Sequence, residues 1–271
     1  MKNNSLIQKL YSGENIYGTA ILSTSPIWSK SVINSGLDFV FLDTEHIPID
    51  RVELTYLCQV YTAMGISPIV RIPSPDPYAA CMVKDAGAIG VIAPYVESVE
   101  QIRQLVGATK YRPLKGERLQ KVLHNEEVLT PELRTYLEKY NEGSLSIVNI
   151  ESVAAFENID ELLNVQGLDA VIIGPHDLSI NMQLPEQYDH PEFEKLVKEI
   201  IKKTRSKGIA AGIHFPSNPK RQIKWMQEGA NIVLHSSDMF LFNQKLNEDI
   251  NKIKLAAGDI SEQSKDFGMA I

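Results

Sequence analysis

Residues 36–46 read GLDFVFLDTEH, and this stretch contains the pattern on which the predicted fold rests. A glycine precedes a continuous apolar run, and ionisable side chains follow that run directly. Continuous apolar runs are typical of parallel strands that are covered on both faces. A segment with helical character, residues 51–64, comes next. The stretch therefore predicts one strand–helix unit with polar groups at the carboxyl end of its strand.

The same unit recurs along the chain. Apolar β-branched runs predict strands at residues 18–22, 39–42, 68–72, 90–93, 146–150, 170–173, 210–213 and 232–234. Segments with helical character lie between them, at residues 51–64, 78–86, 99–109, 154–163, 192–207 and 219–228. Glycines shortly before strands mark the expected ends of helices: Gly36, Gly65, Gly87, Gly167, Gly208 and Gly229. About eight units in a chain of 271 residues favour an α/β fold of the (β/α)8 TIM-barrel type over a doubly wound sheet, which usually has fewer strands.

We expect a single domain over residues 1–271, with the barrel at about 17–240. The polar segment 110–143 interrupts the rhythm after the fourth unit and contains a possible helix near 131–139. It is a candidate lid or interface insertion. Residues 238–271 are expected to form a C-terminal helical extension, because apolar side chains recur near helical spacing over 238–255.

Composition and charge exclude several classes of protein. Hydrophobic residues make up 44% and charged residues 23%, which excludes a disordered scaffold. With 27 Lys+Arg against 34 Asp+Glu the net charge is −7, so we expect neither nucleic acid nor an anionic membrane as a partner. Cys58 and Cys81 lack CxxC spacing and are expected to be buried thiols. Neither a secretory signal nor an apolar run of about 18 residues is present, so we expect a cytoplasmic location.

Polar residues gather where the predicted strands end, which is where barrel enzymes place their active sites. The residues concerned are Asp43, Glu45 and His46 after the second strand, Arg71 at the end of the third, Asn149 and Glu151 at the end of the fifth, Gly174, His176 and Asp177 after the sixth, and His214 after the seventh. Each alone has an ordinary structural explanation, such as a helix N-cap or a satisfied core histidine. The set together predicts a catalytic rim.

Glu151 and Asp177 follow neighbouring strands, which lie about 4.8 Å apart, so their carboxylates could share one ion. Oxygen ligands suit Mg²⁺ or Mn²⁺ rather than zinc, and two protein ligands leave positions for a chelating 2-oxo acid. Arg71 supplies a planar cation that could hold a carboxylate or stabilise an enolate oxygen. His46 lies beside an acid cluster and is the natural proton-transfer group.

Other chemistries lack their residues. The sequence contains no GxGxxG, GxxxxGK[ST], HExxH or GxSxG, so nucleotide, zincin and serine-hydrolase functions have no motif support. An aldolase that forms a Schiff base needs a lysine on or at the end of a strand, and none of the apolar runs contains one. Lys84 is expected in a helix with its amine at the solvated surface.

Six segments in this order resemble the HpcH/HpaI aldolase family, the divalent-metal, pyruvate-dependent class II aldolases. They are GLDFVFLDTEH (36–46), PIVRIP (68–73), VKDAGAIGVIAPYV (83–96), IVNIES (147–152), GLDAVIIGPHDLS (167–179) and GIHFPS (212–217). The resemblance covers roughly residues 17–240. It implies a TIM-barrel enzyme that holds Mg²⁺, Mn²⁺ or Co²⁺.

The resemblance also implies roles for individual residues. It matches Glu151 and Asp177 to the metal ligands, His46 and Asp85 to a proton-transfer dyad, Arg71 to a contact with the substrate carboxylate or oxyanion, and Asp43 and Glu45 to acids that hold water on the ion and the histidine. The pyruvate would contact Asn149, a position that usually carries Gln, and the backbone at His176 and Asp177, with Gly174 and His214 also in the substrate pocket. The loop over residues 111–119 and His176 depart from the family pattern.

The activity implied is reversible cleavage of a 4-hydroxy-2-oxo acid, such as 4-hydroxy-2-oxoheptanedioate or a 2-dehydro-3-deoxy sugar acid, to pyruvate and an aldehyde. The family also implies a homo-oligomer, a hexamer built as a trimer of dimers. Two alternatives use the same site, oxaloacetate decarboxylation and citrate-lyase-like chemistry on an acyl-CoA. A third, from another class, is a non-catalytic binding barrel, and the intact set of rim residues weighs against it.

Overall fold

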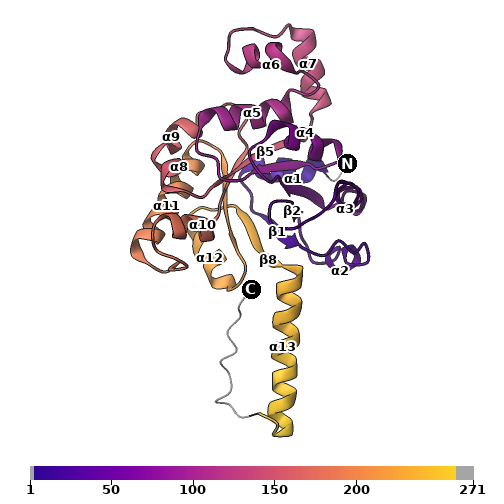
Figure 1. Cartoon of the computed structure of the whole chain (residues 1–271), viewed down its shortest axis with the longest axis vertical. Helices are drawn as coiled ribbons and strands as arrows, with labels where there is room; N and C mark the ends of the chain where they lie inside the picture. The colour runs from indigo at the N-terminus through magenta and orange to yellow at the C-terminus, as the bar shows by residue number, and fades with distance from the viewer. Residues whose placement is uncertain (1–2, 261–271) are drawn as a thin grey trace.

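Eight parallel strands close into a barrel in the order β1 to β8 in the computed structural model, which describes residues 3–260 (Figure 1). The strands are β1 Ile16–Ile21, β2 Phe39–Asp43, β3 Ser67–Arg71, β4 Gly90–Ala93, β5 Leu145–Ile150, β6 Ala170–Ile173, β7 Ala210–Phe215 and β8 Ile232–Ser237. Each pairs in parallel with the next, and β1 pairs with β8 to close the barrel. The predicted TIM-barrel fold is confirmed, and every predicted strand overlaps an observed one.

Helices follow the strands around the outside of the barrel. They are α2 Ser29–Val32, α3 Arg51–Ala63, α4 Pro77–Asp85, α5 Val99–Lys110, α8 Val153–Glu157, α9 Ile159–Leu162, α10 Pro175–Asn181, α11 Pro191–Ser206 and α12 Pro219–Gln227. The segment predicted as one helix over 154–163 is two short helices, because Asn158 between them leaves the helical conformation. The glycines that precede strands adopt positive φ, 108° at Gly87 and 96° at Gly167, as expected where a helix must end and the chain must turn.

Side-chain alternation along the strands positions the site. In β2, Phe39 and Phe41 lie in the apolar cluster inside the barrel, whereas Val40 and Leu42 belong to the cluster between strands and helices. Since successive side chains point to opposite faces, Asp43 shares the inward face of Phe41. By the same alternation, Arg71 shares the inward face of Ile69 in β3, and Asn149 shares the inward face of Ile147 in β5. The apolar interior therefore continues into a polar rim at the carboxyl ends of the strands.

Helix α1, Asn3–Ser12, covers the amino end of the barrel, where Leu6 and Leu10 join the interior cluster. Its Tyr11 hydroxyl donates to Asp169 at 2.7 Å, and Lys110 Nζ lies 2.7 Å from the same carboxylate. The backbone N–H of Ser146 also donates to Asp169, at 2.6 Å. This end of the barrel therefore has an apolar plug and a fully hydrogen-bonded buried acid.

The expectation that Lys84 has a solvated amine is wrong. The Lys84 Nζ donates to the carbonyls of Ala88 and Ile89, at 2.5 and 3.1 Å. Burial, with smaller contributions from the charges of Arg112 and Lys110, lowers the pKa of Lys84 to about 7. The amine is buried because α4 ends over the turn into β4, where these two carbonyls accept its hydrogen bonds.

Two segments extend away from the barrel at opposite ends of the molecule (Figure 1). Helices α6 Gly116–Leu123 and α7 Pro131–Tyr140 form an arm where the insertion was predicted, although α6 was not foreseen. Helix α13, Asp238–Ala257, is the predicted C-terminal extension as far as the described residues reach; the part of the predicted tail beyond residue 260 lies outside them. Exposed apolar side chains line α13: Met239, Leu241, Phe242, Leu246, Ile250, Ile253 and Leu255.

Both cysteines are free thiols; Cys58 in α3 is buried as predicted, whereas Cys81 in α4 is only partly buried. Burial raises the pKa of the Cys58 thiol to about 12, so it is inert at neutral pH. No helix between residues 3 and 260 is both long and apolar enough to cross a membrane.

Candidate active site

Arg71 lies at the centre of the rim, at the end of β3, and contacts acids from two other strands. Its Nε and Nη2 donate to the two carboxylate oxygens of Asp43, at 2.9 and 2.6 Å. Its Nε also lies 3.1 Å from Glu45 Oε2, and its Nη1 lies 4.0 Å from Glu151 Oε1. Burial opposes the ionisation of Asp43, but the hydrogen bonds and charge of Arg71 outweigh it and hold the pKa of Asp43 below its ordinary value. One guanidinium is thus shared among three carboxylates.

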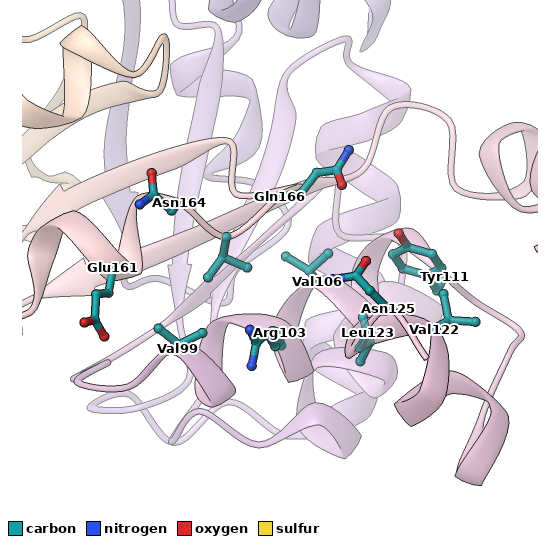
Figure 2. A pocket seen from close by; sticks show the side chains of 11 residues that line it. Val99, Arg103, Val106, Tyr111, Val122, Leu123, Asn125, Glu161, Asn164 and Gln166 are labelled. Carbon is teal, nitrogen blue, oxygen red and sulfur yellow. The ribbon is translucent and has the colours of Figure 1, made fainter. Parts of the chain in front are cut away.

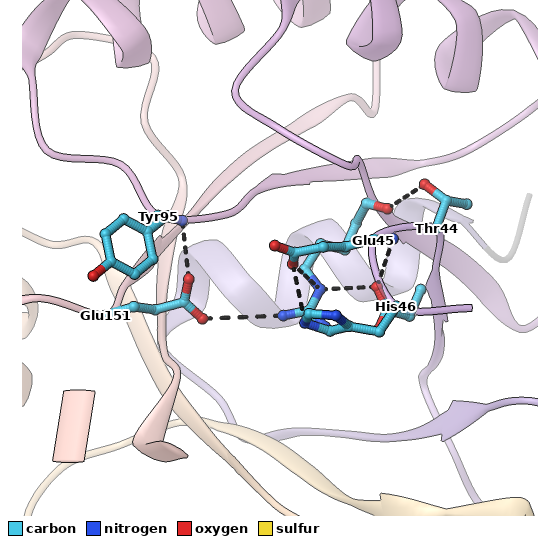
Figure 3. A network of polar contacts seen from close by, with 7 residues as sticks. Thr44, Glu45, His46, Tyr95 and Glu151 are labelled. Atoms are coloured by element: carbon cyan, nitrogen blue, oxygen red, sulfur yellow. Dashed lines mark hydrogen bonds and ion pairs between the residues drawn. The ribbon is translucent and has the colours of Figure 1, made fainter. Parts of the chain in front are cut away.

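Glu151 follows β5 and is 3% exposed. Its Oε2 accepts a hydrogen bond of 2.9 Å from the backbone N–H of Tyr95, which follows β4 (Figure 3). Burial raises the pKa of Glu151 to about 7; the charges of Asp177 and Glu45 add to the rise, while Tyr95 and Arg71 oppose it. Sequence reasoning missed Tyr95, although it lies two residues after the end of a predicted strand. Its contact uses the backbone, in the left-handed region with φ 47°, so its side-chain type gave no signal.

The position of Glu151 depends on Gly174, at the end of β6. A Cβ on Gly174 would lie 2.1 Å from Glu151 Oε1 and 2.7 Å from its Cγ, so the Glu151 side chain would have to move. Glycine matters here for space rather than for backbone conformation, since the residue has an ordinary φ of −88°. Gly174 thus lies directly against Glu151, and its place in a substrate pocket stays a prediction.

Asp177 lies in the first turn of α10 and is partly buried. Its charge contributes to the raised pKa values of both Glu151 and Glu45, for which burial is the first cause, so the three carboxylates lie within electrostatic reach. Beside them, Asn149 Oδ1 is buried and has no hydrogen-bond partner in the described part of the chain. The rim therefore combines an excess of acids with an unpaired amide oxygen.

His46 and Asp85 are not brought together within one chain. His46 lies on the loop after β2, with its side chain 62% exposed and its Nε2 3.7 Å from Glu45 Oε2. Asp85 is the last residue of α4, and its side chain is 71% exposed. Because a helix that follows a barrel strand runs back toward the amino end, Asp85 lies at the end of the barrel opposite to the rim. Its carboxylate instead pairs with Arg112, at 2.6 Å.

The two other rim histidines differ in environment. His176 is exposed, with Nε2 3.6 Å from Glu186 Oε1. His214 points into the barrel, where its ring lies 5.7 Å from that of Phe41, and Phe41 lies 5.4 Å below the Arg71 guanidinium. Burial lowers the pKa of His214 to about 4, so the ring is neutral at pH 7. Its Nε2 lies 3.4 Å from the Ser236 carbonyl, which can only accept, so the proton is on Nε2 and Nδ1 is an acceptor.

A cavity of about 500 Å³ lies away from this rim, between α5, the end of α6 and α9 (Figure 2). None of its lining residues belongs to the acid cluster; they are Val99, Arg103, Val106, Tyr111, Val122, Leu123, Asn125, Glu161, Asn164, Val165 and Gln166. A second cavity, of about 490 Å³, borders the rim at Thr44 and Pro73. Within residues 3–260, no three His, Cys, Asp or Glu side chains form a metal cage by themselves.

Comparisons with known proteins identify the family and agree with the barrel fold. The family model described as HpcH/HpaI aldolase/citrate lyase matches residues 18–244. The 2-keto-3-deoxy-L-rhamnonate aldolase of Salmonella gallinarum is 30% identical over 252 residues, which cover 93% of this chain and 94% of that protein. The crystal structure of an HpcH/HpaI aldolase from Desulfitobacterium hafniense DCB-2 superimposes with a TM-score of 0.80 at 28% identity, covering 92% of this chain and 96% of that one. The crystal structure of the citrate synthase SbnG superimposes with a TM-score of 0.79 at 28% identity, covering 94% of this chain and 99% of that one.

Proposed function

The chain belongs to the HpcH/HpaI aldolase/citrate lyase family, and from this membership and the rim geometry we propose that it cleaves a 2-keto-3-deoxy sugar acid to pyruvate and an aldehyde. Family and relatives make it a carbon–carbon lyase. The observation that carries the proposal is the group of Arg71, Glu151 and Asp177 at the carboxyl ends of β3, β5 and β6. The sugar-acid substrate is taken from the rhamnonate aldolase relatives.

The rim residues fit a divalent cation. Asp43, Glu45 and Glu151 share the Arg71 guanidinium, of which Asp43 already takes two donors, and Asp177 adds a further negative charge that acts on Glu45 and Glu151. A buried cluster of acids with too little positive charge is stabilised by a hard cation, and oxygen donors are the ligands that Mg²⁺ and Mn²⁺ prefer. We assign Glu151 and Asp177 as its protein ligands. When bound, the ion would polarise the 2-oxo group of the substrate and so ease formation of the pyruvate enolate.

Arg71 and His46 divide the remaining chemistry. Arg71 is fixed by Asp43 and Glu45, with Nη1 directed toward Glu151, so it can donate to the oxygen on which negative charge develops. His46 is exposed at the mouth of the rim and takes the proton of the 4-hydroxyl group as the carbon–carbon bond breaks. Asn149 Oδ1 and the neutral His214 Nδ1 offer acceptors to substrate hydroxyl groups.

The dyad of His46 and Asp85 requires two copies of the chain. Both side chains are more than half exposed, and they lie at opposite ends of one barrel. We therefore propose that Asp85 of one copy reaches His46 of another in a homo-oligomer, the hexamer that the family implies. The exposed apolar side chains of α13 are further surface that such an assembly would cover. A monomer by light scattering at micromolar concentration would contradict the oligomer and the dyad together.

The experiment that tests the division of roles is His46→Ala. General acid–base catalysis contributes about 10²–10⁴-fold, so sugar-acid cleavage should fall by that factor while the Kd for Mn²⁺ and for pyruvate stays unchanged. Oxaloacetate decarboxylation should suffer less, because loss of CO₂ gives the enolate without deprotonating a hydroxyl group. Loss of Mn²⁺ binding would make His46 a ligand, and an equal fall in both reactions would contradict its selective role.

A second candidate activity, citrate-forming or citrate-cleaving chemistry on an acyl-CoA, is favoured by the match to the citrate synthase SbnG over 94% of this chain. It would use the same rim, with oxaloacetate in place of pyruvate. Release of free CoA from acetyl-CoA in the presence of oxaloacetate and Mg²⁺, faster than sugar-acid cleavage, would make it the main activity.

A further inference from the structure

Arg112 connects the arm to Asp85. It lies just after α5, at the base of the segment that carries α6 and α7, and its Nη2 donates to Asp85 Oδ1 at 2.6 Å. The two side chains differ in exposure, 14% for Arg112 and 71% for Asp85. The cation is therefore fixed inside the protein surface, while the carboxylate it holds faces outward.

The arm holds the Arg112 side chain in place. Its guanidinium carbon lies 5.8 Å from the centre of the Tyr140 ring, at the end of α7. The Arg112 carbonyl accepts a hydrogen bond of 2.7 Å from Asn141 Nδ2, and Asn141 is the C-cap of the same helix. The backbone contact does not depend on the side chain, so substitution of Arg112 would remove the contact with Asp85 and leave the base of the arm tied.

The carboxylate is only half used by this pair. Arg112 contacts Oδ1, and Oδ2 receives no hydrogen bond from any residue that the structure describes. A carboxylate with one oxygen fixed by a charge-assisted bond and the other free can accept from an imidazole N–H in a single orientation. An unpaired aspartate that is 71% exposed would instead sample several rotamers.

We propose that Arg112 is a positioning residue: it fixes Asp85 so that the free oxygen meets His46 of the partner subunit. This inference rests on the proposed function, which assigns Asp85 and the histidine to proton transfer. It gives the inserted arm a role in catalysis, since the segment that carries Tyr140 also holds Arg112. Fixing one side chain in advance is worth about a threefold to tenfold gain in rate.

A double-mutant cycle tests the inference. Arg112→Met keeps most of the buried stem, Asp85→Asn removes the carboxylate charge, and the double variant combines them. Arg112→Met should lower kcat for sugar-acid cleavage about threefold to tenfold with KM for the substrate unchanged. Asp85→Asn should lower kcat further, and adding Arg112→Met to it should change nothing more. Arg112→Lys should recover part of the loss.

Arg118→Met is the matched control, because Arg118 forms a 2.6 Å pair with Glu127 inside the arm and does not contact Asp85. It should leave kcat unchanged, and all variants should keep the oligomeric state of the wild type. Equal losses from Arg112→Met with Asp85 present and absent would make Arg112 merely structural and overturn the inference. Wild-type kcat in Asp85→Asn would overturn the dyad itself. A loss in Asp85→Asn with none in Arg112→Met would overturn only the positioning role.

Discussion

At the amino end of the barrel, Asp169 is buried with donors on both oxygens: the Tyr11 hydroxyl, Lys110 Nζ and the Ser146 N–H, all within 2.7 Å. At the carboxyl end, Glu151 is equally buried but has one backbone donor, a guanidinium 4.0 Å away and two further acids close enough to raise its pKa beyond the effect of burial. The Asp169 carboxylate thus has donors for both of its oxygens, whereas the Glu151 carboxylate has too little positive charge around it. The residues at the amino end therefore stabilise the folded barrel. Those at the rim lower its stability and leave carboxylates free to bind a ligand.

The largest expected effect is that of Glu151→Gln. Loss of a ligand should reduce cleavage by at least about 10³-fold, since a metal ion contributes several kcal/mol to the transition state. The folded state should not suffer in the presence of chelator, because a neutral amide avoids the cost of a buried carboxylate beside other acids. Steady-state kinetics and urea unfolding measure the two properties. Tight Mn²⁺ binding by the variant, or a marked loss of stability, would contradict the assignment.

Gly174→Ala tests whether the space beside Glu151 matters. The new Cβ would displace Glu151 Oε1, now 2.1 Å from its position, and misplacement by about 1 Å costs roughly 10²-fold in rate. Gly208→Ala is the control at the other end of the barrel, where φ is 74° and a Cβ meets nothing within 4 Å. That variant should lose stability without losing kcat. If Gly174→Ala cleaves substrate at the wild-type rate, Glu151 does not act from its observed position.

Asp169→Asn should have the opposite effect to Glu151→Gln, lowering stability and leaving activity unchanged. Breaking a buried ion pair leaves Lys110 without its counter-charge and costs about 3–5 kcal/mol. The free energy of unfolding, from urea titration, should fall by that amount while kcat and KM per folded molecule remain those of the wild type. A selective loss of kcat in a fully folded variant would contradict the claim that the amino end serves stability and only the rim serves catalysis.

The smallest expected effect is a pH dependence that arises from Lys84. Its pKa is about 7 when folded against an ordinary value of 10.5, so between these values the unfolded chain binds the extra proton. The free energy of unfolding should therefore rise with pH through this window. Below pH 7 the folded chain holds a charged Lys84 amine, and the full cost of burying that charge applies. Compared with Lys84→Met, the wild type should gain about 2 kcal/mol in unfolding free energy between pH 7 and 9. Parallel curves for the two proteins would show that the amine stays charged when folded.

The contrast between the ends also explains what the sequence can predict. Alternation within β2, β3 and β5 follows from the chain alone, and it takes Asp43, Arg71 and Asn149 to the rim together. The contact of Tyr95 with Glu151 runs through a backbone N–H, so no side chain signals it. The expectation of a solvated Lys84 amine is wrong because the amine donates to backbone carbonyls of the turn that follows α4. Composition does not reveal such contacts. The pairing of Asp85 with a histidine needs a surface that a single chain does not contain.

The most direct test of the central claim is pyruvate release from 2-keto-3-deoxy-L-rhamnonate by protein treated exhaustively with chelator, before and after a divalent ion is restored. The account predicts no release after chelation and recovery with Mg²⁺, Mn²⁺ or Co²⁺ in the wild type and in Asp169→Asn. Glu151→Gln should stay inactive with every ion. Full turnover after chelation, or borohydride trapping of pyruvate on a lysine, would contradict a metal-dependent reaction at Glu151 and Asp177.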